Sequence, residues 1–555
     1  MKLRISKAIK FYLLLILLIS SVFLGFNSPD ENNEQSLSEN FNSKYVSQYF
    51  TDLPDWVLLD PDKDGYEGVR TKEFYKYINT LDFVPDRTQV IVAVIDSGFD
   101  IEHPDLKENI WQNLTEVNGV SDVDDDGNGY VDDFNGWNFL GNADYTTLEV
   151  TREYFRLKNL DTPNSDPYFQ KVKQVYEDKK DETITTQKGI SETLNEYLNA
   201  EKILKDGNIT SDPKKLMEIS DKLEGKYQDA ASMILGIYML FGTDKNDLIE
   251  LNDEYTMKVK VLFDSSDVNE LTSDDPSMLL EKNYGNNDVS EKKEIHGTHV
   301  AGIIGSKKTG QSDFVKLMCL KAVPNAGDER DKDIGNAIRY AVDNGASIIN
   351  MSAGKYFSPN PEFVVDAIKY AEEKGVLFVV SAGNEGDDIT DIVNYPRKYI
   401  IENGEKKYFS NMIVVGANSW MKQWDESKDP ENKNLKYDLS APFSNYSREV
   451  IDIFAPGVQI NSTIPEGKYK KIDGTSMAAP VVAGVAAVVK SYYPNLSASQ
   501  LKDAIVSSAR QYDGLKVKVK GKSGKELFSK LSKSGGVVDL INAYRKAGEI
   551  SGSIN

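Results

Sequence analysis

The sequence is poor in two residue types that often carry chemistry, cysteine and histidine. Its 555 residues include one cysteine, Cys319, and three histidines, His103, His296 and His299. A single cysteine cannot form an intramolecular disulfide, and it excludes cysteine-based zinc sites, redox motifs and a lipid-attachment cysteine near the N-terminus. A mechanism that needs an imidazole base must therefore use one of the three histidines.

Basic residues are also in deficit. Lysine and arginine number 65 against 87 aspartates and glutamates, which gives a formal net charge of −22. This balance argues against a broad electrostatic surface for nucleic acid or for an anionic membrane, so we expect no nucleic-acid partner. Hydrophobic residues make up 40% of the chain and charged residues 27%, which is the composition of a folded globular protein.

One long apolar run stands out near the N-terminus. Residues 11–26 are uncharged and mostly apolar, and the basic residues Lys2, Arg4, Lys7 and Lys10 precede them. This layout is typical of a signal peptide, but no small-x-small cleavage site follows, so residues 1–26 are expected to be a signal peptide or an N-terminal anchor. We expect an extracytoplasmic protein that is secreted or held at the membrane by this segment alone.

The remaining chain divides by composition into four segments. Residues 27–79 begin with a polar tether, 80–140 and 292–555 alternate apolar runs with helical patterns, and 141–291 are rich in lysine, glutamate and aspartate. Buried strands are expected at 90–95, 315–323, 347–351, 376–380 and 412–415, and amphipathic helices lie between several of them. That alternation predicts βαβ units and a parallel sheet.

The charged stretch 141–291 interrupts this alternation. Its helical patterns lie around residues 171–177, 191–204, 214–223 and 228–240, and their charges are typical of solvated helix faces. We expect an inserted helical subdomain there. The second part of the main domain, 292–555, is expected to close with helices near 498–508 and 537–547.

Four polar residues lie where predicted strands end or predicted helices begin. Asp96 follows the strand 90–95, and His296 opens the run His296-Gly-Thr-His-Val-Ala-Gly302. Ser476 begins an apolar helix, whose free N–H groups can hold a developing oxyanion, and Asn384 can donate from its side chain. Taken singly, each also fits an ordinary structural role: a turn cap, a buried histidine, a helix cap and a turn asparagine.

Together these residues supply the parts that activate a serine: a nucleophile, an imidazole base and a carboxylate that orients the base. Their chain order, Asp then His then Ser, is the order known from subtilisin. The motifs Ala93-Val-Ile-Asp-Ser-Gly98, His296-Gly-Thr-His-Val-Ala-Gly302, Ser381-Ala-Gly-Asn-Glu-Gly386 and Gly474-Thr-Ser-Met-Ala-Ala-Pro480 resemble those of the subtilisin-like serine proteases, or subtilases.

The resemblance implies a three-layer α/β fold with a mainly parallel central sheet and helices on both faces. It implies Asp96, His296 and Ser476 as the catalytic triad and Asn384 as an oxyanion donor. Polypeptides would be the substrates, hydrolysed through an acyl-enzyme on Ser476.

The resemblance also implies where substrate binds. The peptide would add as a strand beside Ser352, Ala353 and Gly354, an example of β-augmentation. Ala353 is small where many relatives carry a larger residue, which would leave the wall of the primary pocket more open.

An acidic loop, residues 122–133, has the spacing of a calcium site. It places acids at positions 1, 3, 5 and 12 and a glycine at position 6, as calcium loops do. The expected ligands are Asp122, Asp124, Asp126, Asn128 and Asp133, with calcium as a structural ion; the alternative is a solvated acidic turn. Asp105 matches a carboxylate that binds calcium in several subtilisins, but the loop that supplies the other ligands is shortened, so no second site is assigned.

The insertion is the main departure from the family pattern. It separates Asp96 from His296 by 200 residues, and it could cover the cleft, restrict access or recruit a partner. Two other functions fit parts of the sequence: a catalytically silent, calcium-dependent surface binding protein on the same fold, and an esterase that uses the same triad. The intact set of four catalytic side chains favours an exported serine endopeptidase.

Overall fold

The computed structural model describes Leu53 and residues 55–81, 84–264, 272–282, 284–423, 438–522 and 524–552. The predicted signal segment and the polar tether lie outside the described residues. Within them the chain divides into two compact units, residues 150–264 and the remainder, and each unit has its own hydrophobic core.

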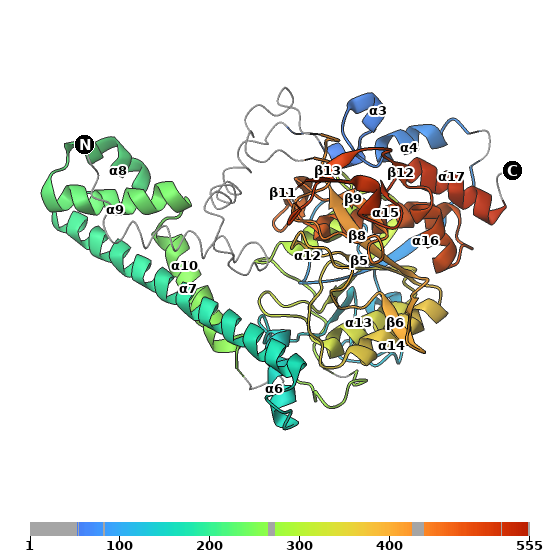
Figure 1. Cartoon of the computed structure of the whole chain (residues 1–555), viewed down its shortest axis with the longest axis horizontal. Helices are drawn as coiled ribbons and strands as arrows, with labels where there is room; N and C mark the ends of the chain where they lie inside the picture. The colour runs from blue at the N-terminus through green and yellow to red at the C-terminus, as the bar shows by residue number, and fades with distance from the viewer. Residues whose placement is uncertain are drawn as a thin grey trace. The chain divides into compact units, whose positions relative to one another are not determined.

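A nine-stranded sheet forms the centre of the larger unit (Figure 1). The strands lie in the order β12-β15-β9-β8-β5-β4-β1-β3-β2 and pair in parallel, except β12 with β15. Their bounds are β1 Val90–Asp96, β2 Gly136–Asn138, β3 Val315–Lys321, β4 Ile348–Met351, β5 Leu377–Ser381, β8 Met412–Asn418, β9 Ile453–Pro456, β12 Arg510–Gln511 and β15 Gly536–Val537. The five predicted strands are β1, β3, β4, β5 and β8, and the predicted α/β class is confirmed.

Helices cover both faces of the sheet (Figure 1). One core contains apolar residues of α4 Thr71–Ile78, α12 His296–Gly305, α15 Thr475–Tyr492, α16 Ala498–Val506 and α17 Leu540–Ser551; the other contains those of α13 Asp331–Asp343 and α14 Pro361–Glu373. Among the described helices, α15 is long and apolar enough to cross a membrane, but 89% of that window is buried inside the protein. It belongs to the core of the larger unit, because it packs on β1, β4, β5, β8 and β9.

Shorter elements complete the larger unit. They are η2 Trp56–Leu58, α3 Pro61–Asp64, α5 Leu114–Val117, η4 Phe528–Lys530 and three hairpins, β6 Tyr399–Glu402 with β7 Glu405–Tyr408, β10 Ile460–Ile464 with β11 Lys468–Ile472, and β13 Lys516–Lys518 with β14 Lys525–Leu527. The hairpin β10–β11 fixes α12, because Ser462 and Thr463 donate side-chain hydrogen bonds of 2.8 and 2.9 Å to carbonyls of that helix. A side chain at Gly302 would collide with Thr463 Oγ1 at 2.1 Å.

The described elements of the smaller unit are all helices: α6 Glu149–Asn159, α7 Pro167–Asp206, α8 Pro213–Ile219, η3 Ser220–Lys222, α9 Gly225–Phe241 and α10 Lys245–Val261, of which Glu149 belongs to the larger unit. Asp166 caps the start of α7 and Pro167 is its first residue, a favourable helix beginning. No proline follows within α7, so the two predicted patterns at 171–177 and 191–204 form one helix of 40 residues.

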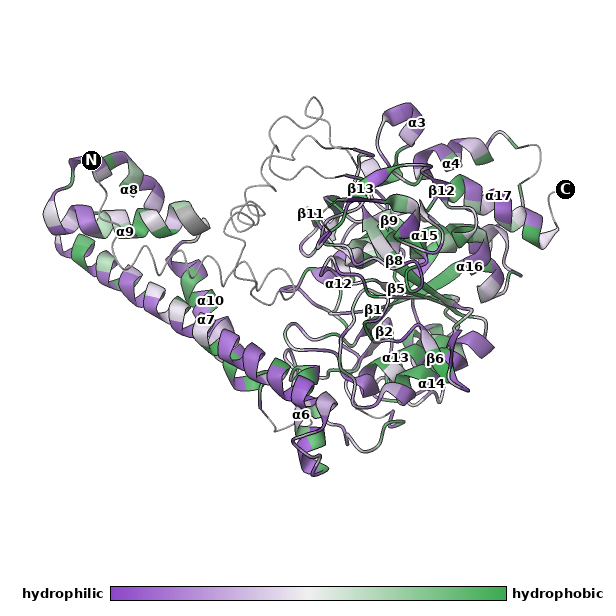
Figure 2. Cartoon of the chain, viewed as in Figure 1, coloured by the Kyte–Doolittle hydropathy of each residue, from purple (hydrophilic) through white to green (hydrophobic). Residues whose placement is uncertain are grey.

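The helices of this unit differ in hydropathy (Figure 2). Helix α7 is largely hydrophilic, whereas α9 is rich in hydrophobic residues. Their shared core includes Tyr197, Leu204, Ala230 and Ile234. The unit is shorter than the insertion expected over 141–291, since residues 141–149 and 272–291 belong to the larger unit.

Candidate active site

Asp96 and His296 meet at the carboxyl end of β1. Asp96 is the last residue of β1 and His296 the first of α12, and Asp96 Oδ1 lies 2.7 Å from His296 Nδ1. The helix can begin this close to the strand because Gly297 has no side chain; a Cβ there would lie 2.2 Å from the Gly98 carbonyl oxygen. With the carboxylate as acceptor, the proton of the neutral imidazole is on Nδ1 and Nε2 is free to act as a base.

The other two histidines have structural surroundings. His299 Nε2 lies 3.0 and 2.9 Å from the carbonyl oxygens of Ile460 and Lys470, and burial lowers its pKa to about 3. His103 Nε2 lies 3.2 Å from the Lys468 carbonyl oxygen. Burial also acts to lower the pKa of His296, but the Asp96 charge and hydrogen bond outweigh burial and raise it.

Ser476 lies in the first turn of α15, against the end of β4. Its hydroxyl donates to the Ser352 carbonyl at 3.2 Å, and the Ser352 hydroxyl donates back to the Ser476 carbonyl at 2.9 Å. In this arrangement the Ser476 proton is directed at Ser352 and not at His296. Catalytic hydrogen bonds are often formed only when substrate is bound.

Asn384 is held beside Ser476 through the neighbouring residue. Its Oδ1 accepts from the N–H of Thr475 at 2.8 Å and from the Thr475 hydroxyl at 2.9 Å. Because Oδ1 is used in this way, Nδ2 is directed toward the space beside Gly474, where an added Cβ would lie 3.8 Å from Nδ2. An amide N–H₂ and the N-terminal backbone of α15 therefore face the same region, as an oxyanion site requires.

The sheet explains why residues so far apart in sequence gather here. Strands β1, β4 and β5 are neighbours, and Asp96, Ser352 and the segment containing Asn384 all lie at their carboxyl ends, where open α/β sheets bind ligands. Helices α12 and α15, which begin with His296 and Thr475, pack against each other.

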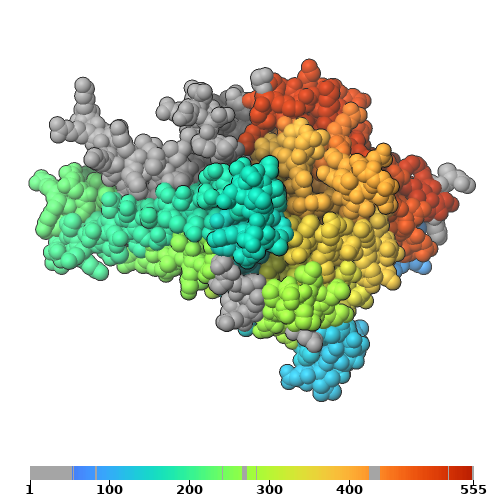
Figure 3. Space-filling view, turned by 60° about the horizontal axis from the view of Figure 1, so that its bottom comes forward, coloured from blue at the N-terminus to red at the C-terminus, as the bar shows by residue number. Residues whose placement is uncertain are grey.

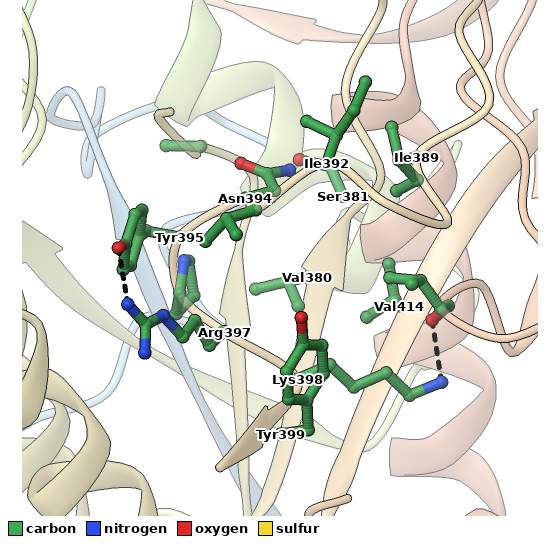
Figure 4. Close-up of a pocket in the computed structure, with 14 residues that line it drawn as sticks. Val380, Ser381, Ile389, Ile392, Asn394, Tyr395, Arg397, Lys398, Tyr399 and Val414 are labelled. Carbon is green, nitrogen blue, oxygen red and sulfur yellow. Dashed lines mark hydrogen bonds between the residues drawn. The ribbon is translucent and has the colours of Figure 1, made fainter. Parts of the chain in front are cut away.

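Ala353, which follows Ser352 in the chain, contributes to the wall of a pocket, and ten other residues of that wall are labelled in Figure 4. Its wall is mostly apolar and is formed by residues that the sequence did not point to, among them Val380, Ile389, Ile392, Val393, Asn394 and Tyr395. The backbone of Tyr395 bonds that of Lys355 in both directions, at 3.0 and 2.8 Å, which ties the pocket to the segment 352–354. A Cβ at Gly354 would lie 3.1 Å from the Tyr395 carbonyl oxygen.

The acidic loop and α5 belong to a surface lobe, seen in light blue at the bottom of Figure 3. Carboxylate oxygens of Glu116, Asp124 and Asp126 lie within 4.8 Å of one another. Glu116 comes from α5 and precedes the calcium-loop spacing, so the sequence reasoning missed it. The side chain of Asp132 is buried, and its Oδ1 has no hydrogen-bond partner among the described residues.

The other predicted ligands have different neighbours. Asp133 is fully buried and accepts from Asn113 at 2.6 Å and Asn128 at 2.9 Å, and burial raises its pKa to about 6. The structure does not include Asp122 in the carboxylate group. Away from the loop, Asp105 Oδ2 lies 3.5 Å from Lys308 Nζ, so an ammonium group already faces that carboxylate.

Comparisons with known proteins agree with this geometry. The model of the subtilase family matches residues 87–529. Subtilisin DY of Bacillus licheniformis is 34% identical over 221 residues, which cover 39% of this chain and 70% of the relative. The major intracellular serine protease of Bacillus subtilis (strain 168) is 36% identical over 224 residues, which cover 38% of this chain and 61% of the relative.

Among solved structures, a cold adapted subtilisin-like serine proteinase is 28% identical, with a TM-score of 0.33 over 43% of this chain and 76% of that chain. The family match extends over most of the chain and includes both halves of the site. The chain therefore belongs to the subtilase family of serine endopeptidases.

Proposed function

We propose that the chain is an exported serine endopeptidase in which Asp96, His296 and Ser476 act as the catalytic triad. The observation that carries the proposal is the 2.7 Å contact of Asp96 with His296 at the carboxyl end of β1. The only other histidines, His103 and His299, bond backbone carbonyls. Export rests on the basic and apolar pattern of residues 1–26.

Catalysis would begin when substrate turns the Ser476 hydroxyl from the Ser352 carbonyl toward His296. His296 Nε2 would take the proton as Ser476 Oγ attacks the scissile carbonyl, and Asp96 would stabilise the imidazolium. Asn384 Nδ2 and the Ser476 N–H would bind the oxyanion. His296 then gives its proton to the leaving amine, and water releases the acyl-enzyme by the same steps.

The peptide would bind along Ser352, Ala353 and Gly354 through main-chain hydrogen bonds. Its side chain at the cleaved bond would enter the pocket beside Ala353. The wall is mostly apolar, and its two cations already have partners, Arg397 in the Tyr395 hydroxyl at 2.7 Å and Lys398 in Asp452 at 2.9 Å. It therefore favours a hydrophobic side chain, which needs no polar partner.

Calcium is proposed as a structural ion of the acidic loop. Glu116, Asp124 and Asp126 supply close carboxylate oxygens, which are the ligands that calcium prefers. The unpartnered Oδ1 of Asp132 is further support, because Asp132 bonds Glu116 through its N–H at 3.0 Å. The predicted ligands Asp122, Asn128 and Asp133 would then shape the loop around the ion.

The first test is casein hydrolysis by the purified chain without residues 1–26. We expect activity that Ser476→Ala abolishes, and labelling of wild type but not of the variant by a serine-directed fluorophosphonate. If wild type neither cleaves casein nor is labelled, the binding-protein function is favoured. Turnover of simple esters with no cleavage of any polypeptide would favour an esterase.

A further inference from the structure

The chain returns from the insertion to the active site through a short segment that ends at His296. Residues 289–291 form a bridge with the segment after Asp96: Phe99 N–H donates to the Val289 carbonyl, and Glu291 N–H donates to the Phe99 carbonyl, both at 3.0 Å. This contact brings the two catalytic segments together five residues before His296.

Glu291 then turns inward and forms an ion pair. Its Oε2 lies 3.1 Å from Lys321 Nζ, and both side chains are less than a tenth exposed. Lys321 is the last residue of β3 and is in register with Asp96 on β1. The pair packs directly on the Asp96 turn, since a Cβ at Gly98 would lie 2.6 Å from Glu291 Cβ and 3.2 Å from Lys321 Cδ.

The second oxygen of Glu291 organises the turn that leads into α12. Oε1 accepts from the N–H groups of Lys292 at 2.9 Å and Lys293 at 2.8 Å. One carboxylate therefore joins β3 to the turn before His296. A buried acid with both oxygens used in this way is fixed in position.

We propose that Glu291, held by Lys321, is a positioning residue that sets His296 against Asp96. The inference rests on the proposed function of the triad and adds a residue that lies in none of the four family motifs. The need for it follows from the insertion, because a connection of 200 residues does not by itself hold His296 in place. Contacts made where the chain returns add to the hydrogen bonds that Ser462 and Thr463 donate to α12.

The test uses Glu291→Ala, with Glu291→Gln as the conservative variant and Asp333→Ala as the matched control. Asp333 is also a buried acid, paired with Arg330 at 2.7 Å, and it lies on α13. We expect Glu291→Ala to lower kcat at least tenfold with KM little changed. Gln retains an oxygen for the two N–H groups and should recover much of kcat, whereas Asp333→Ala should lower Tm and leave kcat unchanged.

A direct readout is the NMR titration of His296, which is practical because the chain has three histidines. The charges that face His296 are those of Asp96 and Glu294. In Glu291→Ala a loosened contact with Asp96 should move the titration to lower pH. Unchanged kcat and titration, despite a lower Tm, would overturn the proposal.

Two controls keep the result interpretable. If Glu291→Ala does not fold, Lys321→Met tests the same ion pair from the other side. It should show the same loss of kcat and the same shift of the His296 titration. A folded Lys321→Met variant with wild-type kcat and titration would show that the proposal is wrong. Failure of the proposed function is distinguishable, because wild type would then show no activity that Ser476→Ala removes.

Discussion

At the scale of single residues, Asp96 controls the protonation of His296. Burial acts to lower the imidazole pKa, but the charge and hydrogen bond of Asp96, aided by Glu294, raise it above 6.5. The neutral imidazole is the form that accepts the serine proton. Activity should therefore rise with pH as His296 loses its proton, and the midpoint of that rise should lie above pH 6.5.

Asp96→Asn should separate these effects. In another Ser-His-Asp protease the equivalent change lowers kcat about 10⁴-fold, because the imidazole takes the wrong tautomer, and we expect a loss of that order here. The residual activity should have its rising limb at lower pH, since the negative charge that raised the pKa of His296 is gone. The measurement is the pH profile of kcat/KM on a chromogenic peptide.

Asp100→Asn is the matched control for this change. It makes the same substitution four residues later, where the Asp100 side chain accepts from the N–H of Glu466 at 2.9 Å. Its profile should follow wild type. If kcat/KM of Asp96→Asn rises at the same pH as that of wild type, the role given to Asp96 is contradicted.

The sequence could point to Asp96, His296, Asn384 and Ser476 because each lies in a short contiguous motif. Glu291 could not be found in this way, since its role depends on Lys321, which is 30 residues away at the end of β3. The pocket residues beside Ala353 are a similar case, because an isolated antiparallel bridge between Tyr395 and Lys355 brings them next to the segment 352–354. Motifs carry chemistry, whereas positioning is decided by packing between segments.

At the scale of elements, five strands of the central sheet could be predicted from the sequence. The strands β1, β3, β4, β5 and β8 are mostly apolar because helices bury them on both faces. Helix α7 was predicted in pieces, because its middle has few apolar positions and its continuity comes from the absence of proline and from packing on α9 and α10.

The acidic loop is the element that calcium should stabilise. An ion that binds only the folded state adds about 2.7 kcal/mol to the free energy of unfolding when its free concentration is about a hundred times its Kd. We expect calcium to raise Tm in wild type and to raise it much less in Glu116→Gln, which removes one of the three close carboxylates. Scanning calorimetry in calcium and in chelator measures both shifts.

Glu102→Gln, a change at an exposed acid of the same unit, controls for loss of charge alone. It should retain the wild-type calcium shift. If calcium raises the Tm of Glu116→Gln as much as that of wild type, calcium binds elsewhere or binds the loop 122–133 without Glu116. No shift in wild type would leave the loop as a solvated acidic turn.

At the scale of the whole molecule, the insertion has a core of its own. Its apolar cluster includes Tyr197, Leu216, Ile234 and Leu248, and among the described residues none of 150–264 contributes to the two cores around the sheet. Its ends come together, because the Thr151 hydroxyl donates to the Leu262 carbonyl at 2.8 Å. The larger unit can therefore be joined directly between residues 151 and 262, without the insertion.

Replacing residues 152–261 by two glycines tests this independence. The shortened chain should fold and should hydrolyse a small chromogenic peptide with the wild-type kcat, because Asp96, His296 and Ser476 keep their supports in the larger unit. Casein hydrolysis reports separately on the insertion: a faster rate means that it restricts access to the cleft, and a slower rate means that it helps to recruit polypeptides. A folded but inactive product would instead show that the helices are needed to assemble the catalytic geometry, and Glu291 would then be insufficient to hold His296.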